Sequence, residues 1–261
     1  MREVLLMRLD APLMSFGAPS IDAFGRTARH PSRSMLTGLF GNALGWDHGD
    51  WERLDGLQRR LRWAARLDRE GSALREYQTV DLGQGHLSTE GRTAVSWTTR
   101  GAIDQRDGGS DAKLGTHQRW RDHWADAVYT VAIGLDGAGP PSLDDLANAL
   151  RRPARPLFLG RKPCLPAAPL FGSLTHALSL AHALSAAPLD LRRVTAGPRR
   201  KADRPTHLRA WWPADETSAA IDGPVELLSV TEERDWRNQI HGGERRLHHG
   251  MLRLTEAEND R

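Results

Sequence analysis

Cysteine is almost absent from this chain of 261 residues, since Cys164 is the only one. One cysteine forms no disulfide within the chain, and a cysteine-based zinc site would need ligands from elsewhere. Long apolar runs are also missing: the run near the start, residues 4–7, is far too short for a membrane span or a signal-peptide core. We therefore expect a cytoplasmic protein with no membrane partner.

Lysine is scarce, because only Lys113, Lys162 and Lys201 stand beside 33 arginines. An arginine side chain binds phosphate through two N–H donors and stacks on bases. The excess of arginine therefore favours a nucleic-acid partner. A GC-rich genome gives the same bias, so the distribution of charge along the chain has to decide between the two explanations. Residues 151–163 hold five basic residues and no acid, residues 192–209 hold seven against one acid, and residues 215–235 hold seven acids against one arginine. Basic charge gathered in this way predicts phosphate contact, although any one run also fits a hydrated surface.

The order of apolar patterns predicts an α+β fold. Helices are expected at 32–44 and 142–150, where Ser32 and Ser142 are suitable N-caps, with a shorter helix at 51–61. Strands are expected at 3–10, 62–69, 127–135 and 156–162. Strand, helix, strand, strand, helix, strand is the ferredoxin-like (RRM-like) βαββαβ arrangement, whose open sheet is used by RNA-recognition domains.

A glycine-rich excursion interrupts this arrangement at residues 83–116, after a strand-like run at 74–80. Its middle is β-prone, which predicts a projecting β-hairpin and not a linker. We expect the ferredoxin-like domain to span 1–163, including this hairpin. A smaller C-terminal domain is expected at 164–261, with a helical stretch at 170–184, a basic loop, strands at 208–212 and 225–230, and a basic tail. Met14, Phe16 and Phe24 are expected to pack in the core.

Several segments are similar, in order, to one family. They are Arg8-Leu-Asp-Ala-Pro-Leu-Met-Ser-Phe-Gly, Pro31-Ser-Arg-Ser-Met-Leu-Thr-Gly-Leu-Phe-Gly-Asn-Ala-Leu-Gly, Arg75-Glu-Tyr-Gln-Thr-Val, Trp124-Ala-Asp-Ala-Val-Tyr-Thr-Val-Ala, Leu159-Gly-Arg-Lys-Pro-Cys-Leu-Pro and Pro169-Leu-Phe. Together they resemble the CasD family of the type I-E CRISPR surveillance complex, Cascade, within the repeat-associated mysterious protein superfamily. Beyond residue 172, only Arg234-Asp-Trp followed by Gly242-Gly243 is similar to the family.

The resemblance implies a non-catalytic, antiviral RNA-binding subunit that holds the 5′ handle of the CRISPR RNA (crRNA) and caps the backbone of the complex. Its implied partners are a CasC-type backbone subunit and a CasA-type large subunit, with target DNA reached indirectly. In the family a thumb-like hairpin lies beside the guide, and residues 83–116 occupy the thumb position. This chain has Tyr77-Gln78-Thr79 where the family commonly has Tyr-His-Thr, so the contact of that histidine is not carried over.

RNA binding requires phosphate donors and stacking planes. The start of the helix at 32–44 offers free backbone N–H groups and nearby side-chain donors, and the loop after the strand at 156–162 offers two cations. Tyr77 and Trp97 are candidates for base stacking, although Trp97 fits equally well as an anchor to a partner protein. The plainer interpretation is that Ser32 only caps its helix and that the arginines stay hydrated. The predicted RNA-binding residues are Arg29, His30, Ser32, Arg33, Ser34, Arg75, Tyr77, Gln78, Trp97, Arg161 and Lys162.

A metal-independent endoribonuclease that processes CRISPR precursor RNA is the alternative function, because type I-C relatives cleave such RNA. Its candidate groups are Tyr77, His86, Lys113 and His117, whose spacing does not show that they meet. A scaffold that contacts only proteins is a third possibility. His241, His248 and His249 lack the spacing of a metal site, and the chain has no Walker loop, dinucleotide fingerprint or serine-hydrolase elbow. We therefore expect no metal and no cofactor.

Overall fold

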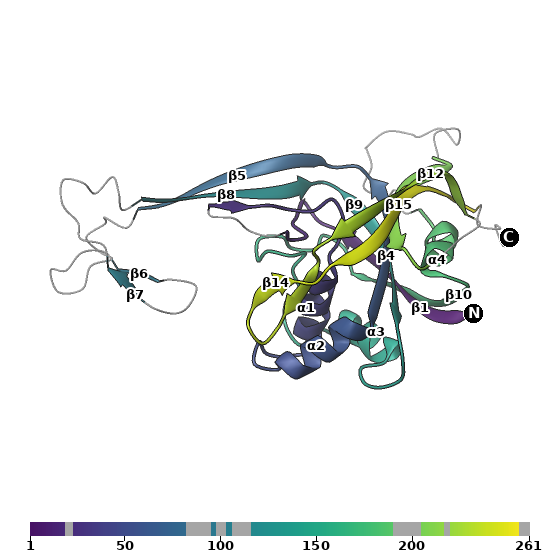
Figure 1. Cartoon of the computed structure of the whole chain (residues 1–261), viewed down its shortest axis with the longest axis horizontal. Coiled ribbons are helices and arrows are strands. Elements are labelled where there is room, and N and C mark those ends of the chain that lie inside the picture. Colours follow the sequence, from purple (N-terminus) through teal and green to yellow (C-terminus); the bar gives the residue numbers. More distant parts are fainter. Residues whose placement is uncertain are drawn as a thin grey trace.

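The computed structural model of the chain describes residues 1–18, 23–81, 95–97, 103–105, 116–189, 205–216 and 220–255. Its body is an antiparallel sheet of seven strands in the order β10-β1-β9-β4-β11-β15-β12 (Figure 1). These strands are β1 (Arg2–Asp10), β4 (Leu61–Arg69), β9 (Val128–Leu135), β10 (Phe171–Ala177), β11 (His207–Pro213), β12 (Ile221–Val230) and β15 (Arg245–Arg253). The mixed α and β composition confirms the predicted α+β class.

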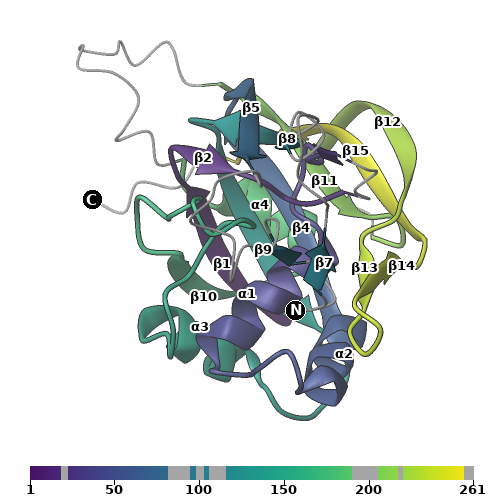
Figure 2. The same cartoon turned by 90° about the vertical axis from the view of Figure 1, so that its left-hand side faces the viewer.

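Helices cover both faces of this sheet (Figure 2). Side chains of β1 alternate: Leu5, Met7 and Leu9 join one core, whereas Val4 and Leu6 join the other. The first core also contains residues of α1 (Arg33–Ala43), α2 (Trp51–Arg60) and α3 (Leu143–Arg151), and the second contains those of α4 (Leu180–Ala186). The sheet is therefore the middle layer of three, and strands buried on both faces are rich in apolar residues.

Local sequence signals placed the starts of α1 and α3 correctly. Ser32 Oγ accepts a hydrogen bond from the backbone N–H of Met35 at 3.1 Å, so it caps α1. Ser142 caps α3, and the Asp145 carboxylate accepts a hydrogen bond from the Ser142 N–H at 2.8 Å, which completes a capping box. Among the described residues, no helix is long and apolar enough to span a membrane.

The predicted strand at 156–162 is wrong. These residues form a loop that lies against the segment after β1, where the Ser15 N–H donates to the Leu159 carbonyl at 3.0 Å. Gly160 has a φ of +96°, which does not fit a strand. The edge strand is instead β10, within the stretch 170–184 that was predicted to be helical; α4 occupies only the end of that stretch. Pairing with β1, a long-range interaction, decides this conformation.

The sheet continues across the predicted domain boundary at 163/164. β10 lies at one edge of it beside β1, while β11, β15 and β12 extend it beyond β4. The strands expected at 208–212 and 225–230 are confirmed as β11 and β12. The predicted basic tail is wrong for residues 245–253, because β15 pairs on both sides with β11 and β12.

A long two-stranded ribbon of β5 (Ser72–Asp81) and β8 (Thr116–Ala125) projects from the body (Figure 1). We refer to these two strands as the ribbon. At its base, β8 also pairs with β2 (Leu13–Met14) and β3 (Phe24–Gly25). The predicted excursion 83–116 falls between the ribbon strands, and only β6 (Val95–Trp97), β7 (Ile103–Gln105) and the first residue of β8 belong to the described part of it.

Candidate nucleic-acid interface

The N–H groups at the start of α1 are bonded to the acidic segment of the same chain, residues 215–235. The backbone N–H of Ser34 donates to the Glu232 carbonyl at 2.9 Å, and that of Arg33 donates to the Glu232 carboxylate at 3.2 Å. Ser32 and Ser34 are themselves buried. The N–H groups that were predicted to receive a phosphate are therefore already bonded within the protein.

Two of the predicted cations near this helix start bind carboxylates. Arg33, whose side chain is only 14% exposed, donates to Glu233 at 2.6 Å. Arg29 is more exposed; its guanidinium pairs with Glu70 at 3.1 Å and lies 5.1 Å from the ring centroid of Trp124. Arg33 is therefore neutralised inside the fold, while Arg29 is at most a surface contact.

His30 belongs to the core and not to a binding surface. Its ring lies 5.5 Å from that of Trp63 and 5.7 Å from that of Trp211, and Nδ1 donates to the Pro31 carbonyl at 3.0 Å. Burial lowers the pKa of His30, so the imidazole is neutral at neutral pH. The prediction of a phosphate cradle at the start of α1 is thus not supported by the position of His30.

A groove of about 650 Å³ lies between the ribbon and the body. Ribbon residues line it together with the loop before Cys164, one side of α1 and the hairpin of β13 (Glu233–Asp235) and β14 (Ile240–Gly242). Six cations and no Asp or Glu occur among the described residues that line it. We call it the basic groove; its cations are Arg26, Arg119, Arg121, Arg161, Lys162 and Arg234.

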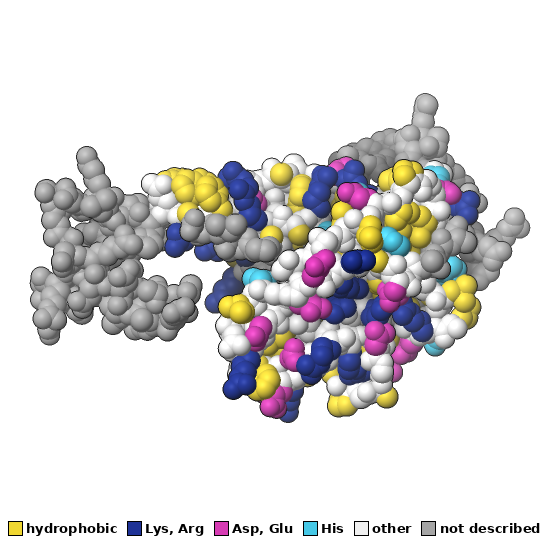
Figure 3. All heavy atoms as spheres, viewed as in Figure 1, with side chains coloured by type: hydrophobic (Ala, Val, Ile, Leu, Met, Phe, Trp, Pro, Cys, Tyr) yellow, Lys and Arg dark blue, Asp and Glu magenta, His cyan; other side chains and the backbone are white. Residues whose placement is uncertain are grey.

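Lys and Arg side chains gather beneath the ribbon where it leaves the body (Figure 3). Ser32, Ser34, Arg161 and Lys162 are the predicted site residues that line the basic groove. Asp122, beside the lining, pairs with Arg26 at 3.7 Å, but the lining itself keeps an excess of positive charge, which attracts a polyanion and makes its binding dependent on salt. The groove is therefore the best candidate for a nucleic-acid interface in the described part of the chain.

Arg161 connects three walls of the groove. Its guanidinium donates to the carbonyl oxygens of Asp122 at 3.0 Å and Gly25 at 2.8 Å. Burial and the nearby charge of Arg121 lower the pKa of Arg161. Because these hydrogen bonds go to neutral carbonyls, Arg161 keeps its net charge for an anion in the groove.

An aromatic stack continues from the groove along the ribbon. The Trp120 ring lies 5.0 Å from that of Phe24, with 19° between the planes, and 5.3 Å from that of Tyr77. Arg26 lies 5.3 Å from the centroid of Phe24. Tyr77 is 54% exposed and Phe24, expected in the core, is 37% exposed; Met14 and Phe16 are buried as predicted. Exposed aromatic faces beside cations are suited to stacking with nucleobases.

The remaining predicted site residues lie outside the lining of the groove. Arg75 is on the ribbon and donates to the Asp122 carboxylate at 2.7 and 3.3 Å, and Gln78 donates to Glu76 at 2.6 Å. Trp97 belongs to β6, but its side chain lies outside the described residues. Arg75 and Gln78 therefore remain candidates as residues of the ribbon and not of the groove.

The sequence reasoning missed most of the ribbon's contribution. Arg119 and Arg121 are two residues apart on β8 and both line the groove, as the period of a strand requires. That alternation was a usable signal. Arg26 and Arg234 carried no comparable pattern, because each reaches the groove through tertiary packing of its segment.

Of the four predicted nuclease candidates, only Tyr77 has a side chain among the described residues. Tyr77 is exposed on the ribbon, whereas the side chains of His86, Lys113 and His117 lie outside the described part of the chain. Cys164 is buried, and burial raises the pKa of its thiol, which opposes formation of a nucleophilic thiolate. No group of three His, Cys, Asp or Glu side chains with the geometry of a metal site occurs among the described residues.

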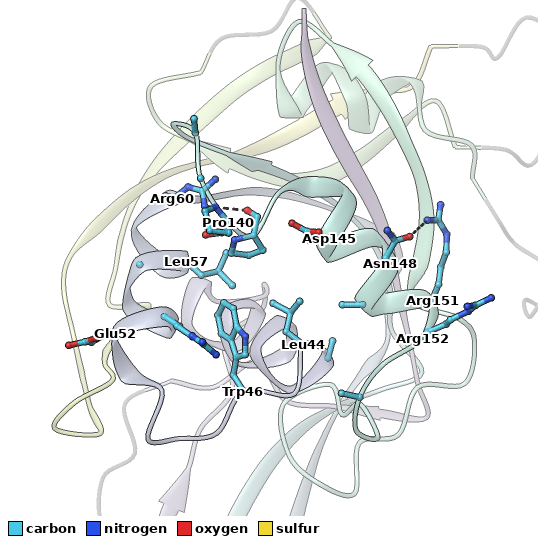
Figure 4. A pocket seen from close by; sticks show the side chains of 18 residues that line it. Leu44, Trp46, Glu52, Leu57, Arg60, Pro140, Asp145, Asn148, Arg151 and Arg152 are labelled. Carbon is cyan, nitrogen blue, oxygen red and sulfur yellow. Dashed lines mark hydrogen bonds between the residues drawn. The ribbon is translucent and has the colours of Figure 1, made fainter.

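A second cavity, of about 1390 Å³, lies between α2, α3 and the loop at 138–141 (Figure 4). Arg60 lines it and donates to the Pro140 carbonyl at 3.0 Å, while Glu52 and Asp145 add negative charge to the lining. Its charges are mixed, so it is a poorer site for a polyanion than the basic groove.

Comparison with known proteins identifies the family. The model of the CRISPR-associated protein family Cas5 matches residues 4–248. The CRISPR system Cascade subunit CasD of Escherichia coli (strain K12) is 30% identical over 171 residues, which are 66% of this chain and 70% of that protein.

Solved structures show the same fold. A chain of a CRISPR RNA-guided surveillance complex matches with a TM-score of 0.63 and 25% identity, over 96% of this chain and 90% of that one. A crystal structure of a Cas protein matches with a TM-score of 0.58 and 24% identity, over 96% of this chain and 95% of that one. The fold is thus that of Cas5-type CRISPR-associated proteins.

The chain belongs to the Cas5 family of CRISPR-associated proteins. Within this family its sequence resembles the CasD subunits, and the resemblance drawn from the sequence is confirmed.

Proposed function

We propose that this protein is the subunit of a type I-E Cascade complex that binds the 5′ handle of crRNA. The observation that carries the proposal is the basic groove: six cations, no lining acid among the described residues, and an adjoining aromatic stack. Phosphates of a short single-stranded segment would follow the cations, while an unpaired base stacks on the exposed face of Tyr77.

The fold supports the same proposal. The order β10-β1-β9-β4, with α1 and α3 in the two connections, agrees with a ferredoxin-like unit whose four strands follow one another as strands 4-1-3-2 of that fold. We propose that the ribbon is the base of the thumb, and that β6 and β7 belong to it. The thumb would then begin at β5, about ten residues before the predicted excursion.

The proposed partners are a CasC-type backbone subunit and a CasA-type large subunit, with target DNA contacted through the complex. The similarity to CasD and to a chain of a surveillance complex supports this assignment. We place its action in the cytoplasm, where crRNA is made.

We further propose that the subunit binds RNA without cleaving it. Among the described residues, His48 and His241 line the basic groove without a carboxylate beside them in the lining, and the buried His123, hydrogen-bonded to Glu76 at 3.2 Å, lies outside that lining. The endoribonuclease alternative predicts a specific cut in labelled repeat RNA in the presence of EDTA, lost in Tyr77→Phe. Uncut RNA at stoichiometric protein is the result that we expect.

The binding proposal is tested with the doubly substituted chain Arg119→Ala/Arg121→Ala. Handle RNA is titrated at several salt concentrations, and the slope of log affinity against log salt is measured. We expect the slope to fall by about 1.4, since each phosphate contact to a single strand contributes about 0.7. Arg59→Ala is the matched control, because Arg59 pairs with Asp55 on α2 outside the groove. Equal slopes for the double variant, the control and the parent would contradict the proposal.

A further inference from the structure

Arg234 is the single arginine of the acidic segment at 215–235, and it differs from the arginines that pair with that segment. It lies on β13 and lines the basic groove, together with Trp236 and His241 of the same hairpin. Nearby Arg33 pairs with Glu233 and Arg245 pairs with Glu232. Among the described residues, no carboxylate forms an ion pair with Arg234.

The backbone of Arg234 is held in place by one buried side chain of α2. Gln58 Oε1 accepts hydrogen bonds from the Arg234 N–H and from Trp236 Nε1, both at 3.1 Å. Gln58 Nε2 donates to the Arg234 carbonyl at 2.9 Å. Because Gln58 and Trp236 are buried, these three hydrogen bonds fix the hairpin against the body.

The guanidinium is also oriented in advance. Nη2 donates to Gln239 Oε1 at 2.7 Å, and the group lies 5.5 Å from the ring centroid of Trp236. Its Nε is buried and has no hydrogen-bond partner among the described residues. Burial lowers the pKa of Arg234, with no carboxylate to oppose the effect. A partly desolvated, unneutralised cation of this kind gains most from an anionic ligand.

We propose that Arg234 binds a backbone phosphate of the RNA in the basic groove, so that the β13–β14 hairpin supplies a wall of the site separate from that of Arg161 and Lys162. This inference rests on the proposed RNA-binding function and adds to it. It assigns a binding role to the C-terminal part of the chain, where a single arginine stands among seven acids. Gln58 is then a positioning residue, because it acts only through the hairpin.

The test compares Arg234→Ala with Arg237→Ala in the full chain, using handle RNA as the probe. Arg237 carries the same charge on the same hairpin, but its guanidinium lies over Trp51, away from the groove lining. We expect Arg234→Ala to weaken binding about tenfold and to lower the salt slope by about 0.7, with Arg237→Ala close to the parent. Arg234→Lys should keep the slope, because the charge remains, and lose part of the affinity.

The outcomes separate this proposal from the proposed function. Parental affinity and slope for Arg234→Ala, with weakened binding by Arg119→Ala/Arg121→Ala, would overturn the role of Arg234 and leave RNA binding in place. Weakened binding by Arg234→Ala with an unchanged salt slope would also overturn the role of Arg234, since the residue would then only stabilise the hairpin and contact no phosphate. Parental binding by both Arg234→Ala and Arg119→Ala/Arg121→Ala would refute the proposed function itself.

Discussion

Replacing Glu232 by Gln tests how the acidic segment holds the interface together. The Glu232 carboxylate, 2% exposed, accepts hydrogen bonds from Arg245 at 2.7 Å, from Trp63 Nε1 at 3.3 Å and from the Arg33 N–H at 3.2 Å. Gln has nearly the same volume but no charge, and its amide group brings a donor to a site that holds only donors. The change therefore leaves Arg245, 10% exposed, without its carboxylate.

Removing one partner of a buried ion pair costs about 3–5 kcal/mol. Arg245 also lies 5.8 Å from the centroid of Trp63, and this cation–π contact keeps part of its stabilisation. We therefore expect a loss of about 3 kcal/mol in the free energy of unfolding, which for a chain of this size lowers Tm by about 6–12 °C.

Differential scanning calorimetry and urea unfolding measure this loss. Glu233→Gln is the matched control: the Glu233 side chain is 32% exposed against 2% for Glu232, so losing its pair with Arg33 is expected to cost less than the loss in Glu232→Gln. Arg245→Met in the Glu232→Gln background should recover part of the stability, because the uncompensated charge is removed. A Tm for Glu232→Gln within about 2 °C of the parent would refute the reasoning.

Three further predictions concern the core, the groove loop and the aromatic stack. Burial lowers the pKa of His30 below 6.5, so the unfolded chain binds a proton that the folded chain does not, and stability falls as pH drops below about 6.5, by up to about 1.4 kcal/mol per pH unit. His30→Phe should flatten this dependence in urea unfolding at pH 5 and 7.5; an unaltered dependence would contradict the assignment. Gly160→Ala places a Cβ 1.6 Å from the Ser15 carbonyl oxygen at a φ of +96°. The free energy of unfolding should fall by more than about 1–2 kcal/mol, which is the cost of the left-handed backbone conformation alone. Gly137→Ala, at a φ of +70° in open space, should lose only that backbone cost. Equal Tm values for the two glycine variants would argue against the close approach. Tyr77→Ala should weaken RNA binding by about 1–3 kcal/mol without changing the salt slope, Tyr77→Phe should bind as the parent does, and a changed slope would show that Tyr77 does not act by stacking on a base.

Sequence signals predict structure reliably where the interaction is local. Ser32 and Ser142 cap helices because each side chain bonds to an N–H only three residues away. The buried strands β1, β4 and β9 stand out as apolar runs, since both faces of the sheet are covered. β8 did not stand out, because its residues on the projecting ribbon are largely polar.

The candidate site depended on contacts between residues far apart in the sequence. Arg33 has the sequence context of a free phosphate ligand, but Glu233, two hundred residues further on, lies beside it. His30 precedes a helix start, where an exposed side chain is expected, but Trp63 and Trp211 enclose it. The basic groove draws its cations from segments near residues 26, 120, 161 and 234, so only the fold brings them together.

Photo-crosslinking of handle RNA in the native complex tests the central claim most directly. Photoreactive nucleotides at each handle position are crosslinked, and the adducts on this subunit are mapped by mass spectrometry. Adducts should fall on residues 119–121 or on Phe158, Gly160, Arg161 and Lys162, which line the basic groove. Adducts confined to the cavity between α2 and α3, or none on this subunit, would contradict the account.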